Sequence, residues 1–400
     1  MPASPLQPIV IWLGRVGDMI LLSALLGILH RRYGAPCHVI GAGAWPAEIY
    51  AVHGDVARVS CLHRYTAFLL DPAWWRTLRL LRATRSDPVY VCEYDPRKLA
   101  RVRRLLRFAG VDPRRCLFIT DDAAPPAHRV DTPADVDAAL PHTFKPSSAH
   151  WVDRLVRFGE LTPPAFDAGA YPCRPSTPPC AAPRLEVSAA ARTECDAWIA
   201  SRGLSGQPLV LVQPGNRRTM RGARLDLARD DDKAWPLERW GQLLRGIHAQ
   251  LPQAAIVLCG APRESLLLGW IAAAAQLACV VPAELPLSRL LALCARAHSM
   301  ISVDTGPAHA AAALSLPLVV MFGAHSAQEW LPRSPSGSPV VAVGGPPQSS
   351  RLDQIAVESV FAAWCALPGR GASAAVGASG AAGAGTDRGL TPTAARATAP

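Results

Sequence analysis

The chain has 400 residues and a mass of 42.5 kDa, and half of its residues are hydrophobic. Because an average domain needs roughly 100–200 residues, this length predicts two domains and excludes a small stapled scaffold. Charged residues make up 18% of the chain, and its apolar runs are shorter than the roughly 18 residues of a membrane span, so neither wholesale disorder nor a transmembrane helix is expected. The eleven cysteines include no Cys-x-x-Cys pair, which disfavours a zinc site or disulfide framework and indicates a reducing, cytoplasmic location.

The first half of the chain alternates short β-branched runs with longer helical patterns. This rhythm is typical of βαβ units, in which helices cover a parallel sheet. Gly34 stands where a helix that starts near Asp18 would place its left-handed C-terminal residue. The predicted strands are residues 9–13, 89–94 and 116–120, and the predicted helices are residues 18–33 and 96–109.

A proline-rich stretch over residues 162–183 breaks this rhythm and is interpreted as the core of an interdomain linker. From Gly369 onward, Ala, Gly, Ser and Thr dominate without periodicity, which predicts a disordered tail. Between the two lies a second alternating unit, with predicted strands 209–212, 255–259, 300–303 and 318–322 and predicted helices 188–201, 236–251, 263–278, 287–297 and 307–314. The predicted organisation is a first domain over residues 1–165, a linker over 166–186, a second domain over 187–368 and a tail over 369–400.

The net charge of +10 comes almost entirely from arginine, because the chain has only the lysines Lys98, Lys145 and Lys233. The densest basic stretch, residues 97–107, has helical spacing that leaves an apolar stripe on one face and a strongly basic face opposite. That face either is simply solvated or meets an anionic partner such as a membrane surface or a phosphorylated lipid. No zinc finger, RRM signature or Lys-rich arm accompanies it, so a nucleic-acid partner is not expected.

The first candidate site follows the strand at residues 9–13, where Gly14, Gly17 and Asp18 open a helix. Open α/β sheets bind ligands at the carboxyl ends of their strands, and this is such an end. The Gly-x-x-Gly spacing permits close approach of a ligand but is only a weak dinucleotide fingerprint. Asp18 at the predicted helix start has two interpretations, a helix cap or a functional carboxylate.

The second candidate site follows the strand at residues 209–212 and begins with Gln213 and Gly215. Lys233 ends the next loop just before Pro236, which is predicted to open a helix. A compact cation at this edge of the sheet can neutralise phosphate, although a solvated loop lysine is the alternative. The aspartates at 230–232 are expected to pair with arginines or solvent, so no metal and no other cofactor is predicted.

The most informative stretch is Asp304-Thr305-Gly306-Pro307-Ala308-His309, in which a strand, an acid, a hydroxyl, a glycine and a helix start follow one another. The main-chain N–H groups at such a helix start predict a phosphate cradle. An acid beside an anion site is unfavourable unless the ligand also offers hydroxyls. A ligand with both phosphate and sugar hydroxyls resolves that conflict. His309 is interpreted either as a packed helix residue or as a further ligand contact.

These motifs together resemble glycosyltransferase family 9, the ADP-heptose:lipopolysaccharide heptosyltransferase family. The matching segments occur in the family's order across most of residues 9–332. They are Gly17-Asp18, Gln213-Pro214-Gly215, Asp231-Asp232-Lys233-Ala234-Trp235-Pro236, Gly260-Ala261-Pro262-Arg263-Glu264, and Asp304-Thr305-Gly306-Pro307-Ala308-His309 through Phe322-Gly323.

The resemblance implies an α/β fold of the GT-B class, in which two Rossmann-like, doubly wound domains face each other across a cleft. It also implies that Asp18 is the general base, that Lys233 contacts the donor phosphates and that Glu264 contacts the ribose. Asp304, Thr305 and Gly306 are implied to hold the sugar and diphosphate. The remaining donor-site candidates are Gln213, Gly215, Thr219 and His309, and the acceptor-site candidates are Gly17, Arg97, Arg101 and Arg104.

The expected function is inverting, metal-independent transfer of a sugar, with heptose from ADP-heptose as the leading candidate, to a lipopolysaccharide-core or related cell-envelope glycan. The expected partners are a nucleotide-sugar donor, an anionic glycolipid acceptor and the inner face of the cytoplasmic membrane. Two alternatives stay open. One is a non-catalytic nucleotide-binding or scaffold protein with the same fold, and the other is a Rossmann oxidoreductase, which needs a dinucleotide fingerprint that this chain lacks.

Overall fold

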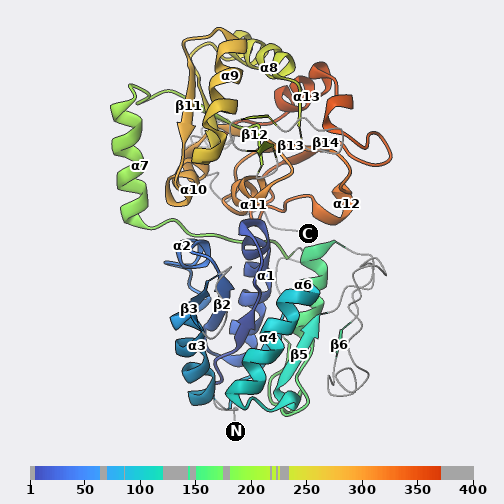
Figure 1. Cartoon of the computed structure of the whole chain (residues 1–400). Coiled ribbons are helices and arrows are strands. Elements are labelled where there is room, and N and C mark those ends of the chain that lie inside the picture. Colours follow the sequence, from blue (N-terminus) through green and yellow to red (C-terminus); the bar gives the residue numbers. More distant parts are fainter. Residues whose placement is uncertain are drawn as a thin grey trace, which may run out of the picture.

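Two six-stranded parallel sheets with flanking helices form the molecule, one built from each half of the chain (Figure 1). The alternation of strands and helices predicted two doubly wound halves, and this fold class is confirmed. The computed structural model describes residues 5–63, 70–84, 86–119, 143–144, 150–173, 181–216, 219–221, 224–225 and 234–370.

The first unit has the strand order β3-β2-β1-β4-β5-β6, with β1 inside the sheet between β2 and β4. In the register, Val10 lies opposite Val39 on one side and Tyr90 on the other. The strands are β1 (Ile9–Ile11), β2 (Cys37–Ala42), β3 (Val56–Leu62), β4 (Val89–Val91), β5 (Cys116–Ile119) and β6 (Thr143–Phe144). The helices are α1 (Val16–Tyr33), α2 (Trp45–Ile49), α3 (Pro72–Ala83), α4 (Pro96–Ala109) and α6 (Trp151–Glu160).

The second unit repeats this order as β11-β10-β7-β12-β13-β14. Its strands are β7 (Leu209–Gln213), β10 (Ala255–Gly260), β11 (Val280–Glu284), β12 (Ser299–Val303), β13 (Leu318–Phe322) and β14 (Val340–Gly344). Its helices are α7 (Ala189–Ser201), α8 (Leu237–Gln250), α9 (Ser265–Ala275), α10 (Leu287–Arg296), α11 (Gly306–Ala313), α12 (Ala327–Trp330) and α13 (Val357–Cys365). A small antiparallel pair, β8 (Met220–Arg221) and β9 (Arg224–Leu225), stands apart from both sheets.

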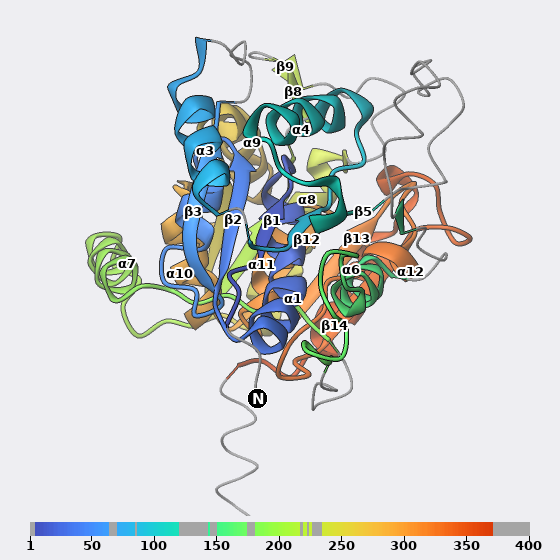
Figure 2. The same cartoon turned by 90° about the horizontal axis from the view of Figure 1, so that it is seen from below.

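The alternation of side chains along each central strand places helices on both faces of its sheet. In β1, Ile9 and Ile11 belong to the core beneath α3 and α4, whereas Val10 belongs to the core beneath α1 and α6. Figure 2 shows these two helix pairs on opposite sides of the first sheet. The core beneath α1 continues without a break to α10 and α11, so the two units share one hydrophobic cluster.

Helix α1 is buried along most of its length, because it packs against its own sheet and α6, and its N-terminal end meets α11 of the second unit (Figure 1). The helix begins at Val16, so the prediction that Asp18 starts it is wrong by two residues. Asp18 is instead the third helical residue, and its Oδ2 accepts a hydrogen bond from the Arg15 N–H at 2.6 Å. A carboxylate at that position can reach back to the chain before the helix. Gly34 ends the helix with φ of +76°, as predicted.

Other predicted boundaries also differ from the structure, and the strands predicted over residues 9–13 and 89–94 end at Ile11 and Val91. The helix predicted over residues 263–278 is divided into a 3₁₀ turn (Pro262–Glu264) and α9, which ends where Gln276 adopts φ of +56°. Pro236 was predicted to open a helix, but it is the capping residue before α8. Glu264 therefore lies at the junction of two helical segments rather than inside one.

The segment between the units is partly packed against the first unit. The Arg184 N–H donates to Ser23 Oγ at 3.0 Å, and the Arg184 carbonyl accepts from His53 Nε2 at 3.0 Å. At the other end, Gly369 is buried and the Arg370 N–H donates to the His298 carbonyl at 2.9 Å. The Arg370 main chain is therefore paired with the second unit, and the start of the tail at Gly369 stays a prediction. The other domain limits stay predictions.

Candidate functional site

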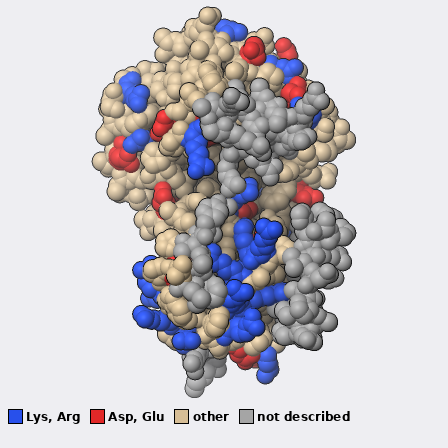
Figure 3. Space-filling view, viewed as in Figure 1, with Lys and Arg blue, Asp and Glu red and all other residues tan. Residues whose placement is uncertain are grey.

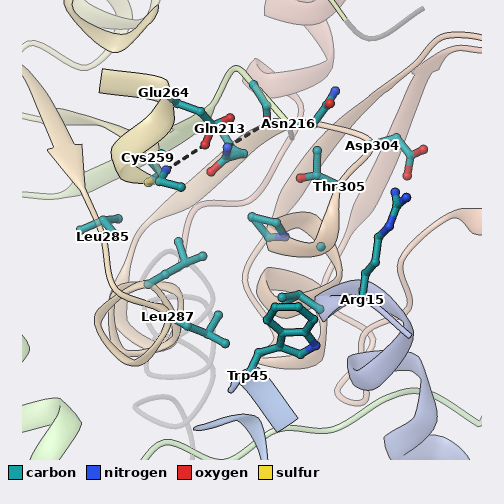
Figure 4. Close-up of a pocket in the computed structure, with 18 of the residues that line it drawn as sticks. Arg15, Trp45, Gln213, Asn216, Cys259, Glu264, Leu285, Leu287, Asp304 and Thr305 are labelled. Atoms are coloured by element: carbon teal, nitrogen blue, oxygen red, sulfur yellow. Dashed lines mark hydrogen bonds between the residues drawn. The ribbon is translucent and has the colours of Figure 1, made fainter. Parts of the chain in front are cut away.

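A cavity of about 440 Å³ lies between the two units, within the range of ~300–1,000 Å³ that is typical of small-molecule sites. The first unit contributes Arg15, Val16, Gly17 and Trp45 to its wall. The second unit contributes the carboxyl ends of β7, β10 and β12 and the start of α11 (Figure 4). A ligand site was predicted at such strand ends. The cavity is bordered by strand ends of both units.

The glycine turn of the first unit touches the Asp-Thr-Gly turn of the second. A Cβ atom added to Gly306 would lie 3.1 Å from the Gly17 nitrogen and 3.2 Å from Val16 Cβ. A Cβ added to Gly17 would lie 3.5 Å from Gly306 Cα. Glycine at position 306 therefore allows the two helix starts to approach each other, and both turns border the same cavity.

The start of α11 is open toward the cavity. Thr305 is its capping residue, but its side chain makes no capping hydrogen bond, and its buried Oγ1 has no hydrogen-bond partner among the residues that the structure describes. The predicted cradle is smaller than expected, because the Ala308 N–H already donates to the Thr305 carbonyl at 3.1 Å. Gly306 and the Thr305 hydroxyl remain the parts of the predicted cradle that line the cavity.

Glu264 brings a buried carboxylate to the opposite side of the cavity. Its Oε2 accepts from the Ala261 N–H at 2.8 Å, whereas its buried Oε1 has no hydrogen-bond partner within the described part of the chain. Burial raises the pKa of Glu264, and the Ala261 hydrogen bond offsets this only in part. A buried acceptor without a partner is unfavourable, so this oxygen is suited to a hydroxyl of a ligand.

Gln213 and Gly215 form the turn that supports Glu264. The buried Gln213 side chain donates from Nε2 to the Gly215 carbonyl at 2.9 Å. A Cβ at Gly215 would lie only 2.6 Å from Glu264 Oε1, so a side chain there would displace the carboxylate. Beside this polar group the cavity wall is apolar, formed by Cys259, Leu285, Leu287 and Leu290.

Asp304 faces the cavity as predicted, but it is paired with a residue that the sequence analysis missed. His325 Nδ1 lies 2.8 Å from Asp304 Oδ2. His325 also lines the cavity, from the loop between β13 and α12. No motif marked this histidine, since it follows Phe322-Gly323-Ala324 without a spacing that indicates chemistry.

Asp18 is close to the cavity but does not line it. Its carboxylate accepts from the Arg15 N–H, and it packs so closely that a Cβ at Gly14 would lie 2.5 Å from Asp18 Cβ. The capping interpretation of Asp18 is therefore what the geometry shows directly. The Arg15 side chain instead enters the cavity and extends toward Asp304 (Figure 4).

Three other donor-site candidates have different positions. His309 is buried, with its Cδ2 3.5 Å from a Cβ built on Gly17, so it packs at the junction of the two turns. Thr219 is buried outside the cavity wall, where its Oγ1 accepts from the Asn216 N–H at 2.9 Å and shapes the turn after β7. Lys233 and the aspartates at 230–232 lie outside the described residues.

The acceptor-site arginines lie on α4, away from the cavity wall. Arg97 and Arg104 are exposed. Figure 3 shows that Lys and Arg side chains gather on this face of the first unit. Arg101 is turned inward: its Nη2 lies 3.3 Å from Asp71 Oδ2, and its guanidinium stacks over Trp74 at 5.9 Å. Arg101 thus links α4 to α3, whereas Arg97 and Arg104 of the same helix are exposed.

The sequence of the second unit matches a known family. Residues 207–353 match Glycosyltransferase family 9 (heptosyltransferase). No curated protein matches the chain by sequence.

Solved structures match the whole architecture. The E. coli ADP-heptose lps heptosyltransferase II is 20% identical, with a TM-score of 0.66 over 90% of this chain and 98% of that protein. The glycosyltransferase of family 9 from Veillonella parvula DSM 2008 is 14% identical, with a TM-score of 0.65 over 91% and 97% of the two chains. E. coli heptosyltransferase WaaC with ADP is 18% identical, with a TM-score of 0.57 over 89% and 98%.

The two doubly wound units that face each other across the cavity form a GT-B fold, and the chain shares this fold with the three solved structures. More particularly, the sequence similarity to glycosyltransferase family 9 lies in residues 207–353, and this match agrees with the resemblance that the motifs carry. Among the described helices, none is both long enough and apolar enough to cross a membrane.

Proposed function

We propose that the protein transfers a sugar from a nucleoside diphosphate sugar to a cell-envelope glycan of the lipopolysaccharide-core type, with ADP-heptose as the leading donor. The observation that carries this proposal is a pair of buried oxygens that face one cavity, Glu264 Oε1 and Thr305 Oγ1. Neither has a hydrogen-bond partner among the described residues. A ligand that carries both hydroxyls and phosphate satisfies the two atoms together. The names of the structurally similar enzymes agree with this class of donor.

In this proposal, the donor lies in the cavity with its base at the end near Glu264 and its diphosphate at the start of α11. The base would lie against the apolar wall of Leu285, Leu287 and Leu290, with the ribose hydroxyls donating to Glu264 Oε1. The diphosphate would then reach the start of α11, where the Thr305 hydroxyl can donate and the helix end favours negative charge. The family resemblance adds Lys233 as a phosphate contact. Protein groups supply this charge in the proposal, so the transfer needs no metal ion.

The transfer step is a single displacement with inversion. An acceptor hydroxyl oxygen forms a bond to the anomeric carbon, and the bond from that carbon to the diphosphate oxygen breaks. The acceptor proton passes to the Asp18 carboxylate, and the nucleoside diphosphate leaves with the electron pair. The Arg15 N–H holds one oxygen of Asp18 and so orients the carboxylate at the edge of the cavity. A base of this kind typically contributes about 10²–10⁴-fold.

The acceptor and the membrane are proposed to meet the first unit at α3 and α4. These helices pack side by side and carry three arginines and six basic residues, respectively, without any acidic residue. Trp75 and Phe108 are exposed on the same two helices, with 43% and 52% of their surface accessible. Basic side chains beside exposed aromatic ones suit an anionic lipid surface, where the charges attract and the rings enter the interface.

Sedimentation with phosphatidylglycerol vesicles tests this surface. Replacing Arg97 and Arg104 with Glu is expected to weaken binding at least about tenfold, because each basic residue near an anionic membrane contributes ~1 kcal/mol. The control is the same charge reversal at Arg192 and Arg202, which are exposed in and just after α7. Binding that is insensitive to salt, or equally weakened by the control, contradicts the assignment.

Calorimetric titration with ADP-heptose and other nucleotide sugars tests the donor assignment. The wild-type protein is expected to bind a nucleotide sugar, and Glu264→Ala is expected to lose about tenfold in affinity, because the ribose hydroxyls lose their acceptor. Exposed Glu48→Ala is the matched control. Absence of binding to any nucleotide sugar would refute the proposed function.

A non-catalytic nucleotide-binding protein is the second candidate, and one observation favours it: Asp18 acts as a helix cap and does not line the cavity. The two candidates predict the same donor binding but different turnover. Release of the nucleoside diphosphate that depends on acceptor and is lost in Asp18→Asn supports the enzyme. Donor binding without release in the presence of lipopolysaccharide-core acceptors supports the alternative.

A further inference from the structure

We propose that His325, held by Asp304, recognises a hydroxyl group of the transferred sugar. This inference rests on the proposed function and deepens it, because it names the part of the donor that the pair contacts. Neither residue 325 nor an Asp–His pair was indicated by the sequence motifs. The geometry of the loop after β13 carries the argument.

His325 is fixed from two sides. Its Nδ1 lies 2.8 Å from Asp304 Oδ2, and the Asp304 N–H donates to the Met321 carbonyl at 3.0 Å, which ties the acid to the end of β13. On another side, the imidazole lies beside the Trp330 ring of α12, with ring centres 6.4 Å apart. The side chain is nevertheless 46% exposed, and it lines the cavity. A histidine that is held in place and faces a cavity is suited to ligand contact.

The pairing determines which ring nitrogen is available. An ionised carboxylate only accepts hydrogen bonds, so Nδ1 of His325 must carry the proton that is donated to Asp304. Nε2 is then a lone-pair acceptor in the neutral ring and an N–H donor in the protonated ring. Sugar hydroxyls can both donate and accept, so either charge state of His325 can bind one.

The position of Asp304 and His325 along the cavity indicates that they contact the sugar of the donor. Glu264 and Leu285 lie at one end in Figure 4, whereas Asp304, Thr305 and the Arg15 side chain lie at the other. With the base and ribose at the Glu264 end and the diphosphate at the start of α11, the group beyond the diphosphate reaches Asp304 and His325. In this arrangement Asp304 orients the imidazole of His325, and Nε2 of that ring contacts the sugar.

The decisive comparison is between ADP and ADP-heptose as titrants of the full chain. His325→Asn places an amide near Nδ1, which can keep the contact to Asp304, but it lacks any atom at Nε2. We expect its affinity for ADP to stay within about twofold of wild type and its affinity for ADP-heptose to fall about tenfold, as for one lost hydrogen bond to a sugar. His325→Gln carries a polar atom near Nε2 and is expected to recover part of this loss.

His63 provides a matched control, because its Nδ1 is also paired with a buried carboxylate, that of Asp71, at 2.6 Å, outside the cavity wall. His63→Asn is expected to change neither affinity. Equal losses for ADP and ADP-heptose in His325→Asn would place the contact on the phosphates and overturn the proposal, as would no loss for either. Failure of the wild-type protein to bind any nucleotide sugar would instead refute the proposed function.

Deoxy analogues of the donor locate the hydroxyl. If Nε2 binds a particular hydroxyl, removing that hydroxyl weakens binding to the wild-type protein about tenfold and has no further effect in His325→Asn. Additive losses at every position of the sugar ring would overturn the inference. The thermal midpoint of each variant confirms that it is folded before titration.

Discussion

The two units share one strand order, yet they use the end of the fourth strand differently. In the first unit the acid after β4 is Glu93, and in the second unit the acid after β12 is Asp304. Glu93 is 1% exposed and accepts from the Leu13 N–H at 3.1 Å and the Asp95 N–H at 3.0 Å. Asp304 instead faces the cavity and holds His325. The acid after the fourth strand therefore binds main-chain N–H groups in the first unit, whereas in the second unit it pairs with a side chain at the cavity.

The helices that follow these acids show the same contrast. Helix α4 begins with Asp95, whose Oδ1 accepts from the N–H groups of Arg97 and Lys98 at 3.0 and 3.1 Å. Helix α11 begins with Thr305, whose side chain makes no such bond. A helix start that supplies its own carboxylate has little attraction for an outside anion, whereas one that lacks it can attract phosphate. The difference between a structural and a ligand-binding helix start is therefore one side chain.

The largest expected effect is on turnover, and it comes from a substitution at Asp18 that distinguishes a helix cap from a catalytic base. Asp18→Asn keeps an oxygen that can accept from the Arg15 N–H, so the helix cap survives, but it removes the base. We expect kcat to fall about 10²–10⁴-fold with an unchanged Kd for the donor, measured by acceptor-dependent release of nucleoside diphosphate. Turnover within a few-fold of wild type would leave Asp18 as a cap alone.

The burial of Glu93 in the turn after β4 predicts that the stability of the protein depends on pH. Burial raises the pKa of Glu93 to about 7, and Lys98 and the two N–H groups offset this only in part. The pKa of Glu93 in the folded protein therefore lies above its ordinary value of 4.5. The stability that protonated Glu93 contributes is fully present below pH 4.5 and is lost as the pH rises through about 7. The loss is about 3 kcal/mol for a shift of this size.

Urea unfolding from pH 4.5 to pH 8 measures this contribution. The free energy of unfolding of wild type, relative to Glu93→Gln, is expected to decline across that range, because glutamine does not ionise. Exposed Glu48→Gln controls for the loss of one negative charge. A constant difference between wild type and Glu93→Gln would show that Glu93 is already ionised in the folded protein.

An exchange of capping residues tests the contrast between α11 and α4 directly. Thr305→Asp gives α11 a carboxylate like that of α4, and we expect ADP affinity to fall about 100-fold while stability is retained, because the new charge repels phosphate and caps the helix. The reciprocal Asp95→Ala is expected to cost about 1 kcal/mol of stability and leave ADP affinity unchanged. Unchanged ADP affinity in Thr305→Asp would show that the diphosphate lies elsewhere.

The smallest expected effect concerns the contact between the units away from the cavity. Arg333 binds Asp153 of α6 through two contacts, at 2.6 and 2.8 Å, and this hydrogen bonding lowers the pKa of Asp153. Because both side chains are partly exposed, Arg333→Ala is expected to cost no more than about 1 kcal/mol. The contribution is present above the ordinary aspartate pKa of 3.8 and disappears as the pH falls below it.

Thermal unfolding at two salt concentrations checks the Arg333 prediction, since screening weakens an exposed pair. Exposed Arg296, which binds Asp196 within the second unit, is a matched control for an ion pair that does not join the units. A salt-independent loss well above the expected size would mean that Arg333 stabilises the interface through packing instead.

Much of the fold was predictable because its signals are local. Helix α4 was predicted with its observed limits, since Asp95-Pro96 provides a start and Gly110 a left-handed end. Strand β13 was likewise predicted as observed, from a short buried run bounded by Pro317 and Gly323. The edge strands β3, β11 and β14 were missed, because their side chains are only partly buried and their apolar pattern is weak.

The candidate site was predictable where a motif follows a strand. Gly17, Gln213, Gly215, Glu264, Asp304, Thr305 and Gly306 all reach the cavity. His325 and Arg15 were missed, since neither stands in a spacing that indicates chemistry. The inward turn of Arg101 was also beyond the sequence, because it depends on Asp71 and Trp74 of a different helix.

The sequence by itself determined the two doubly wound units, the limits of α4 and the strand ends that carry polar side chains, because these features depend on residues close together in the chain. Only the tertiary structure decided that Gly17 meets Gly306, that Glu264 and Thr305 face one cavity, and that Asp304 holds His325. Such pairings depend on the packing of one unit against the other and on loops that meet only after both sheets have formed.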